Sequence, residues 1–264
     1  MGRFVPWSGV VHRCYRGSIA ASCAVATMLT VHRALGTWSR MVDVYIALTE
    51  FARRKFIEAG FPAEKIIVKP NFVYSDPGIG GGKGGYVLFV GRLSPEKGVS
   101  TLLKAWELIN GMVPLKIAGD GPMAEQVAEA ARRVPGVEWV GRKSIEDIYP
   151  LMGEASLVLV PSECYETFGR VVIEAFAKGT PVLVSAIGAL AELVDPGRTG
   201  FHFRPGDPED LASKVEWAWT HPRQLAEMRR EARAEYEAKY TAERNYEMLM
   251  DIYHLAISRA KGRC

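Results

Sequence analysis

The chain has 264 residues, of which 48% are hydrophobic and 24% are charged. This balance is ordinary for a folded protein with a sizeable core, and it excludes an intrinsically disordered chain. The formal net charge of +3 comes from basic residues spread along the chain, which fits a small anionic ligand or an anionic membrane surface but not a dedicated nucleic-acid-binding protein.

The cysteines indicate neither a metal site nor a disulfide framework. Cys14, Cys23, Cys164 and Cys264 form no CxxC motif and no metal-binding pattern with the five histidines. We therefore expect no metal, and a reducing, cytoplasmic location.

The first segment with a clear pattern is apolar. Residues 17–31 carry no charged side chain, and Arg13 and Arg16 precede them. A membrane-spanning helix needs about 20 apolar residues, and a secretory signal would place its apolar stretch nearer the start, followed by a cleavage site. The pattern predicts a buried or interfacial helix. It leaves open a peripheral association with the inner face of a membrane, for instance as a subunit that works with another chain.

The next segment has the order strand, helix, strand over residues 41–72, and residues 73–84 are rich in Gly and Pro. Two strands and two helices before residue 73 are too few for an independent doubly wound domain. We interpret residues 1–72 as the remnant of an N-terminal domain and residues 73–84 as a linker.

From residue 85 on, short apolar runs alternate with helical patterns. Strands are predicted near 85–91, 113–119, 137–141, 156–162, 180–186 and 200–203. Strands that are apolar almost throughout are buried on both faces, as in a parallel sheet covered by crossover helices. The predicted fold class is α/β, with a Rossmann-like doubly wound parallel sheet over residues 85–240 and a final helix over 241–264.

Charged residues and glycines follow the predicted strands at their carboxyl ends, which is the edge where such sheets bind ligands. Arg92 and Lys97 lie between a strand end at Gly91 and a helix that starts near Val99. A planar guanidinium, a compact ammonium and a helix N-terminus together suit a diphosphate. On their own, the two cations would fit a solvated loop equally well.

The following strand ends add a glycine-rich turn at Gly119 and two acidic residues. Residues 163–182 (ECYETFGRVVIEAFAKGTPV) set Glu166 in a loop and Glu174 in the first turns of the next helix, so we expect both carboxylates to face the crevice. Carboxylates accept hydrogen bonds from the vicinal hydroxyls of a sugar or ribose. Glu174 alone could simply compensate its helix dipole, but the combination predicts a nucleotide-sugar pocket.

Four stretches resemble the donor-binding domain of the retaining family-4 glycosyltransferases, which have the GT-B fold: GRLSPEKG, IAGDGP, VPSECYETFGRVVIEAFAKGTPVLVS and GALAELVDPGRTGFHFRPGDPEDLA. The resemblance is dense over about residues 84–220, and its most specific element is the glutamate pair in ETFGRVVIE. It implies transfer of a hexose-type sugar from a nucleoside-diphosphate sugar to an acceptor hydroxyl, with retained configuration and without a metal or other cofactor.

The resemblance also implies roles for individual residues. Arg92 and Lys97 would stabilise the departing diphosphate, and Glu166, the third catalytic residue, would hold the hydroxyls of the transferred sugar. Glu174 would hold the ribose hydroxyls. The other donor-binding residues implied are Gly91, Gly119, Asp120, Gly141, Arg142, Thr167, Phe168, Gly169 and Arg170.

The chain departs from this family at its amino end. Family members begin with a complete acceptor domain that has a histidine near the reacting carbon, whereas residues 1–72 resemble only its last third. We therefore interpret the chain as truncated, with an incomplete N-terminal acceptor domain, and we interpret His12 as a structural or exposed histidine and not as the one near the reacting carbon. The helix from residue 241 would cross back to the N-terminal part, and exposed apolar surface there would allow a homodimer.

The alternative function is a non-catalytic nucleotide-sugar-binding module that has lost turnover with its acceptor half. The sequence assigns neither the base, the sugar nor the acceptor.

Overall fold

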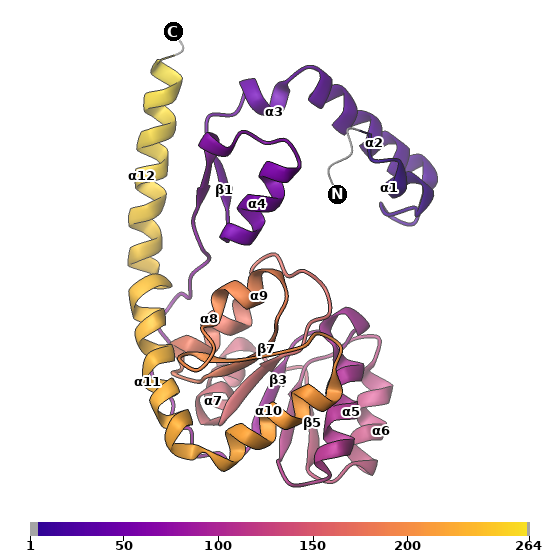
Figure 1. The fold of residues 1–264 in the computed structure, drawn as a ribbon, viewed down its shortest axis with the longest axis vertical. Coiled ribbons are helices and arrows are strands. Elements are labelled where there is room, and N and C mark those ends of the chain that lie inside the picture. Colours follow the sequence, from indigo (N-terminus) through magenta and orange to yellow (C-terminus); the bar gives the residue numbers. More distant parts are fainter. Residues whose placement is uncertain (1–4, 263–264) are drawn as a thin grey trace. The chain divides into compact units, whose positions relative to one another are not determined.

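The computed structural model describes residues 5–262, which form two compact units (Figure 1). Unit 1 contains the residues up to Lys69 together with those from Glu247 on, and unit 2 contains Pro70–Tyr246. Each unit has its own parallel β-sheet. Cys264 lies outside the described residues.

Unit 1 is built around two short strands. Its elements are α1 (Trp7–Val11), α2 (Ile19–Ala34), α3 (Thr37–Arg40), β1 (Tyr45–Ala47), α4 (Glu50–Glu58), the 3-10 turn η1 (Ala63–Lys65), β2 (Ile66–Val68) and the later part of α12 (Ala242–Lys261). β1 and β2 pair in parallel, so the predicted order of strand, helix, strand is confirmed. In the same unit, the Arg259 guanidinium donates hydrogen bonds of 3.0 Å to the carbonyls of Asp43 and Glu64.

The apolar segment 17–31 forms the helix α2, as predicted, but little of it is buried. Only Ser22 and Ala26 are buried along this helix, because its apolar side chains are distributed around the whole circumference and unit 1 covers a single stripe of it. The buried alternative is therefore wrong within unit 1, and the interfacial alternative stays a prediction. No helix among residues 5–262 combines the length and apolar character that a bilayer crossing requires.

Unit 2 contains a six-stranded parallel sheet with the strand order β5-β4-β3-β6-β7-β8. The strands are β3 (Val87–Val90), β4 (Leu115–Ala118), β5 (Val137–Gly141), β6 (Leu157–Val160), β7 (Val182–Ser185) and β8 (Gly200–Phe203). The connections contain η2 (Pro95–Lys97), α5 (Val99–Ile109), α6 (Ala124–Arg133), α7 (Ile145–Glu154), α8 (Arg170–Ala177) and α9 (Gly188–Leu193); α10 (Pro208–Thr220) and α11 (Pro222–Lys239) follow β8. The predicted doubly wound parallel sheet is thus confirmed.

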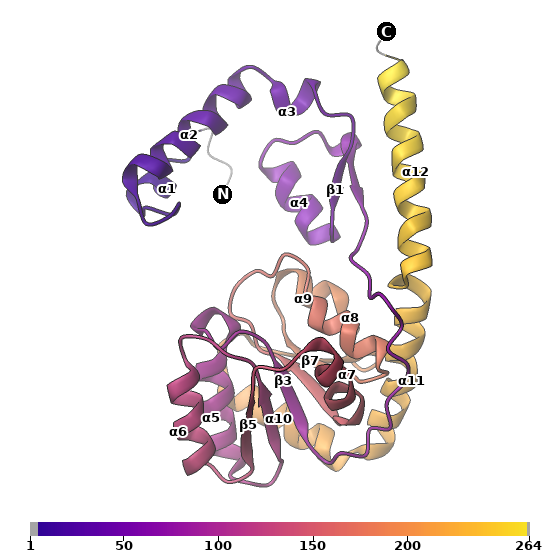
Figure 2. The same ribbon diagram turned by 180° about the vertical axis from the view of Figure 1, so that it is seen from behind.

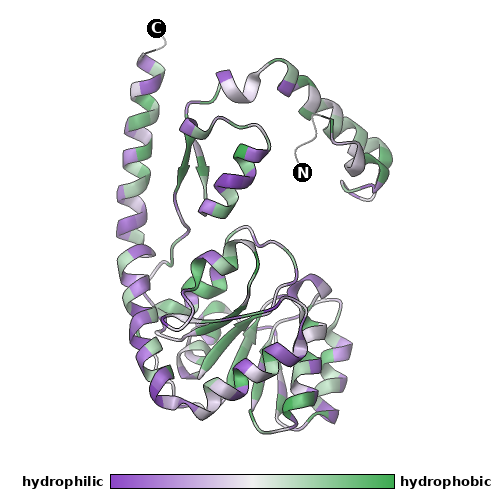
Figure 3. Ribbon diagram, viewed as in Figure 1, coloured by the Kyte–Doolittle hydropathy of each residue, from purple (hydrophilic) through white to green (hydrophobic). Residues whose placement is uncertain are grey.

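Both faces of this sheet are buried, which explains why its strands are apolar almost throughout. In β3, Val87 and Phe89 belong to the core that α5 and α10 complete, whereas Leu88, between them, is fully buried on the opposite face. Figures 1 and 2 show the helices around the sheet from two sides, and Figure 3 shows mainly hydrophobic strands beside helices that mix hydrophobic and hydrophilic residues.

Residues 73–84 contain no helix or strand, as the Gly-rich composition suggests, but side chains of unit 2 hold them. The guanidinium of Arg229 donates to the carbonyl of Gly80 at 3.0 Å, and Arg233 pairs with Asp76 at 2.6 Å. The carboxylate of Glu154 accepts hydrogen bonds from the backbone N–H groups of Gly81 and Lys83. The segment therefore belongs to the surface of unit 2 and is not a free tether.

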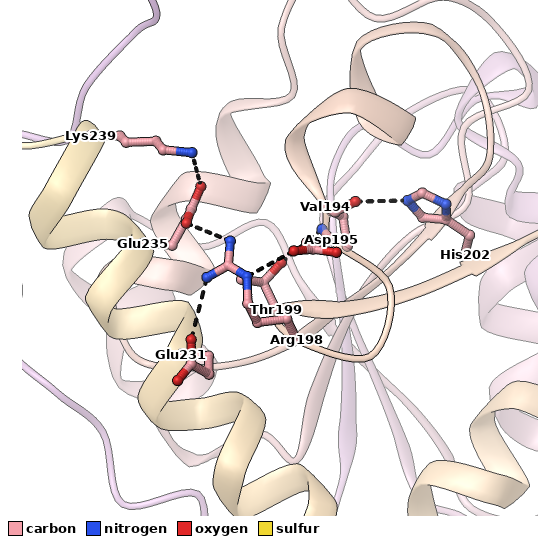
Figure 4. A network of polar contacts seen from close by, with 8 residues as sticks. All are labelled: Val194, Asp195, Arg198, Thr199, His202, Glu231, Glu235 and Lys239. Atoms are coloured by element: carbon pink, nitrogen blue, oxygen red, sulfur yellow. Dashed lines mark hydrogen bonds and ion pairs between the residues drawn. The ribbon is translucent and has the colours of Figure 1, made fainter.

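A polar network joins the turn before β8 to α11 (Figure 4). Arg198 donates to Asp195 at 2.8 Å and to Glu235 at 2.7 Å, and Lys239 also donates to Glu235, at 2.6 Å. Burial alone would raise the pKa of Glu235, but the hydrogen bonds from Lys239 and Arg198 outweigh it and lower that pKa. Glu235 therefore stabilises the fold above its unfolded-state pKa, and this contribution is lost as the pH falls through its lowered folded-state pKa.

Candidate functional site

The sheet of unit 2 reverses its strand order between β3 and β6. β4 and β5 extend the sheet from β3, whereas β7 and β8 extend it from β6. The loop after β3 leads to α5 and the loop after β6 leads to α8, and these two helices cover opposite faces. A crevice opens outside the carboxyl ends of two such strands, and it is the usual ligand site of this architecture.

The loops after β3 and β6 are held directly against each other. The backbone N–H of Glu163 donates to the carbonyl of Glu96 at 2.9 Å. Gly98 has a φ of +71°, and a Cβ there would lie 1.8 Å from the carbonyl oxygen of Pro161, so a side chain would push the loops apart. This close approach keeps Lys97 beside the loop that carries Glu166.

A cavity of about 300 Å³ lies at this junction. Its lining combines one cation-bearing loop, one acidic loop and the start of α8. The lining residues are Asn71, Phe89, Val90, Gly91, Arg92, Lys97, Val160, Pro161, Ser162, Glu166, Thr167, Phe168, Gly169, Arg170 and Val171. The three residues predicted to be catalytic, Arg92, Lys97 and Glu166, are therefore brought together.

Glu166 is tied to both sides of this cavity. Its Oε1 atom lies 2.5 Å from the Nζ atom of Lys97 and accepts a hydrogen bond of 2.6 Å from the hydroxyl of Ser162. The side chain of Glu166 is 15% exposed and that of Lys97 is 31% exposed. The ion pair thus joins the ends of β3 and β6 while both groups keep contact with the cavity.

A second cavity, of about 400 Å³, adjoins the first and shares Val90, Gly91 and Arg92 with it. Its other lining residues are Ala118, Gly119, Asp120, Gly121, Arg142, Lys143 and Ile148. The predicted residues Gly119, Asp120 and Arg142 therefore line one common space next to the loop after β3. Arg92, which is exposed, is available to both spaces.

The start of α8 forms one wall of the first cavity. Gly169 precedes the helix with a φ of +99°, a conformation that a residue with a side chain rarely adopts. Phe168 is 1% exposed, and its ring packs edge-on against Tyr240 at a centroid distance of 6.3 Å. This packing anchors the loop, whose residues Thr167 and Arg170 line the cavity.

Two predicted residues do not line either cavity. Glu174 is buried in α8 and pairs with Arg170 at 3.2 Å. Burial raises the pKa of Glu174, and the charge of Arg170 opposes part of that rise. Gly141 ends β5, and its carbonyl accepts a hydrogen bond from the N–H of Gly119 at 2.9 Å. Glu174 is therefore linked to the first cavity through Arg170, and Gly141 is linked to the second through Gly119.

Sequence reasoning missed three cavity residues with polar side chains. Ser162 lies two residues after the end of β6, and its place between an apolar strand and an acidic loop could have indicated it. Asn71 lines the first cavity from the segment before the predicted linker, and Lys143 lines the second beside Arg142. Within residues 5–262, no group of three or more His, Cys, Asp or Glu side chains is arranged to hold a metal ion.

A crevice at the switch point of a parallel sheet, with fixed cations, carboxylates and a helix N-terminus, defines an α/β protein equipped to bind a nucleotide-type ligand. A model of the family "Glycosyl transferases group 1" matches residues 80–235. The chain belongs to this family.

One curated relative is the glycogen synthase of Mycobacterium tuberculosis, which is 36% identical over 154 residues. The match covers 56% of this chain and 36% of that protein, so the chain spans about a third of the length of this relative. D-rhamnosyltransferase WbpZ of Pseudomonas aeruginosa is 34% identical over 161 residues, which cover 60% of this chain and 42% of that protein.

The fold is also similar to that of solved GT-B structures. The crystal structure of Anabaena Alr3699/HepE in complex with UDP matches with a TM-score of 0.77 and 24% identity, over 85% of this chain and 67% of that chain. At this level of identity the similarity establishes the fold alone, and it confirms the predicted Rossmann-like, GT-B type of sheet.

Proposed function

We propose that the chain is a glycosyltransferase that moves a hexose-type sugar from a nucleoside diphosphate to an acceptor hydroxyl, with retained configuration and without a metal. The observation that carries the proposal is the first cavity, where Arg92, Lys97 and Glu166 surround one space at the switch point. Membership of the glycosyl transferases group 1 family supports it, as does the UDP bound to the similar HepE structure.

The two cations suit the leaving group. Departure of a diphosphate builds negative charge on its oxygens and positive character on the sugar carbon. Arg92 and Lys97, which lie in the loop after β3, would stabilise the negative charge as it develops. The free N–H groups at the start of α8, near Gly169 and Arg170, would add their partial positive charge. No protein nucleophile is invoked.

The carboxylates suit the hydroxyl groups of the donor. Glu166, inside the first cavity, would accept hydrogen bonds from the transferred sugar. Glu174 would accept them from the ribose once Arg170, which now pairs with it, turns toward the phosphates. The second cavity, with Gly119, Asp120 and Arg142, would take the base, since Arg92 adjoins both spaces.

Release of nucleoside diphosphate tests this proposal. The full chain is incubated with UDP-glucose and with ADP- and GDP-glucose, with and without acceptor sugars, and the free diphosphate is measured. We expect turnover with one donor, and a loss of about 100-fold in Lys97→Met because a cation at the leaving group is removed. Lys104→Met, an exposed lysine on α5 outside both cavities, is the matched control and should behave as wild type.

Two outcomes would contradict the proposal in different ways. Binding of a donor without release, under all acceptor conditions, would indicate a nucleotide-sugar-binding module instead of an enzyme. Failure of all three donors and their free diphosphates to bind would remove the nucleotide assignment itself.

A further inference from the structure

The carboxylate of Glu166 is held through only one of its oxygen atoms. The Nζ atom of Lys97 lies 2.5 Å from Oε1, and the hydroxyl of Ser162 donates to the same atom at 2.6 Å. Within residues 5–262, no hydrogen bond reaches the other oxygen, Oε2. The side chain is nevertheless 15% exposed and lines the first cavity.

Among the described residues, only Ser185 Oγ is a buried side-chain polar atom without a hydrogen-bond partner, so Oε2 of Glu166 keeps access to solvent. A ligand that fills the cavity would displace this solvent and would have to supply a hydrogen-bond donor in its place. A carboxylate oxygen can only accept hydrogen bonds and would repel a phosphate oxygen, whereas a sugar hydroxyl can donate to it. The free Oε2 therefore points to the carbohydrate part of the ligand and away from the diphosphate.

The two groups on Oε1 differ in how firmly they hold it. Lys97 has a flexible side chain that is 31% exposed, and it is also the cation expected to engage the diphosphate, which would draw it from Glu166. Ser162 is 1% exposed and directly follows Pro161 at the end of β6. Its short side chain has little freedom, so its hydrogen bond is the one that persists when the diphosphate is bound.

We propose that Ser162 is a positioning residue for sugar recognition: it fixes Glu166 through Oε1 so that Oε2 faces the donor sugar and accepts one of its hydroxyls. This inference rests on the proposed function, because it requires a nucleotide-sugar in the cavity. Ser162 itself touches neither the diphosphate nor the base, and its effect is confined to the sugar.

The test compares the affinities of the full chain for UDP and UDP-glucose by calorimetry, or for the ADP or GDP pair if that is the pair that binds. We expect Ser162→Ala to bind the diphosphate as wild type does and to bind the nucleotide-sugar about 3- to 10-fold more weakly, the value of one hydrogen bond. Ser162→Thr, which keeps the hydroxyl, should restore most of this loss.

Two further variants separate positioning from a general structural role. Ser94→Ala removes another buried serine hydroxyl that donates to a glutamate, Glu96, outside both cavities, and it should leave both affinities unchanged. In a Glu166→Ala background, Ser162→Ala should have no additional effect on sugar affinity, since the two residues act as one unit.

The outcomes distinguish this inference from the proposed function. If Ser162→Ala weakened the binding of the diphosphate and of the nucleotide-sugar equally, the inference would be overturned and the loop would have a general structural role. The same conclusion would follow if Ser162→Ala still weakened sugar binding in the Glu166→Ala background. Unchanged sugar affinity would overturn it as well. Failure of the wild-type chain to bind any pair would instead overturn the proposed function, and this inference with it.

Discussion

Glu174 shows how one side chain balances burial against charge. It is buried at 7% exposure, and it pairs with Arg170, whose own side chain is 65% exposed. Burial disfavours the ionised carboxylate and raises its pKa, while Arg170 favours it. The proposed contact of Glu174 with a ribose would use the ionised form, which accepts hydrogen bonds at both oxygens.

A pH dependence of nucleotide affinity follows. As the pH falls through the raised pKa of Glu174, protonation removes an acceptor, so the affinity for the nucleoside diphosphate should fall at a higher pH than an ordinary glutamate would allow. Glu174→Gln should bind the nucleoside diphosphate about 3- to 10-fold more weakly at neutral pH, the value of one hydrogen bond. Calorimetric titrations of both proteins between pH 5 and about pH 8 check this.

The phosphates of the ligand also titrate and contribute to the pH dependence of the affinity. The comparison with Glu174→Gln separates the contribution of Glu174 from theirs. The ratio of the two affinities should approach one as the pH falls. A ratio that stays constant with pH would show that Glu174 does not act through its ionisation.

At the residue scale, the sequence predicted which residues form the site better than it predicted how their side chains are oriented. Glu166 and Lys97 were predicted to share a pocket because both follow buried parallel strands, whose carboxyl ends meet at one edge. The contact of Ser162 with Glu166 depends on the path of the loop, which no periodicity encodes. Whether Glu174 is accessible likewise depends on whether the guanidinium of Arg170 pairs with it.

At the element scale, all six strands of unit 2 were predictable because burial on both faces leaves an apolar run in the sequence. The segment 73–84 was less predictable. Its Gly and Pro content is typical of a flexible linker, but Glu154, Arg229 and Arg233 hold it from helices far away in the sequence. Composition describes the local chain and says nothing of such distant partners.

Arg229 is the central support of this segment. It donates hydrogen bonds to the carbonyls of Gly80, Gly153 and Ala155, and burial lowers its pKa. Arg229→Ala should lower the free energy of unfolding of unit 2 by about 1–3 kcal/mol, because these carbonyls lose their donor. Denaturant unfolding measures the loss, and limited proteolysis should show faster cleavage within 78–84.

The matched control is Arg230→Ala, which removes an exposed arginine next in sequence. It should change the stability by no more than about 0.5 kcal/mol. Equal effects of the two variants would contradict the role given to Arg229.

At the scale of the whole molecule, the two units differ in their cores. The hydrophobic core cluster of α5, α6, α10 and the strands lies entirely in unit 2. The buried apolar residues of unit 1, as far as the structure describes it, are Val10, Ala26, Ala47, Ile66 and Ile252. Because burial of apolar surface is the main stabilising term, unit 1 should be the less stable of the two.

Calorimetry of the full chain should therefore show two transitions. The lower one belongs to unit 1. A nucleoside diphosphate that binds the switch-point crevice should raise only the upper transition, by about 2.7 kcal/mol of stability at a ligand concentration 100 times Kd. A single transition that shifts as a whole would show that the units unfold together.

The pairing of Lys97 with Glu166 joins residues 69 positions apart in the sequence. While the ribosome is still making the segment up to β6, the cationic loop exists without its acidic counterpart, and β3 has only β4 beside it. The crevice is completed when β6 inserts next to β3. A ligand that engages both Lys97 and Glu166 can therefore stabilise only those states in which β6 has already paired with β3.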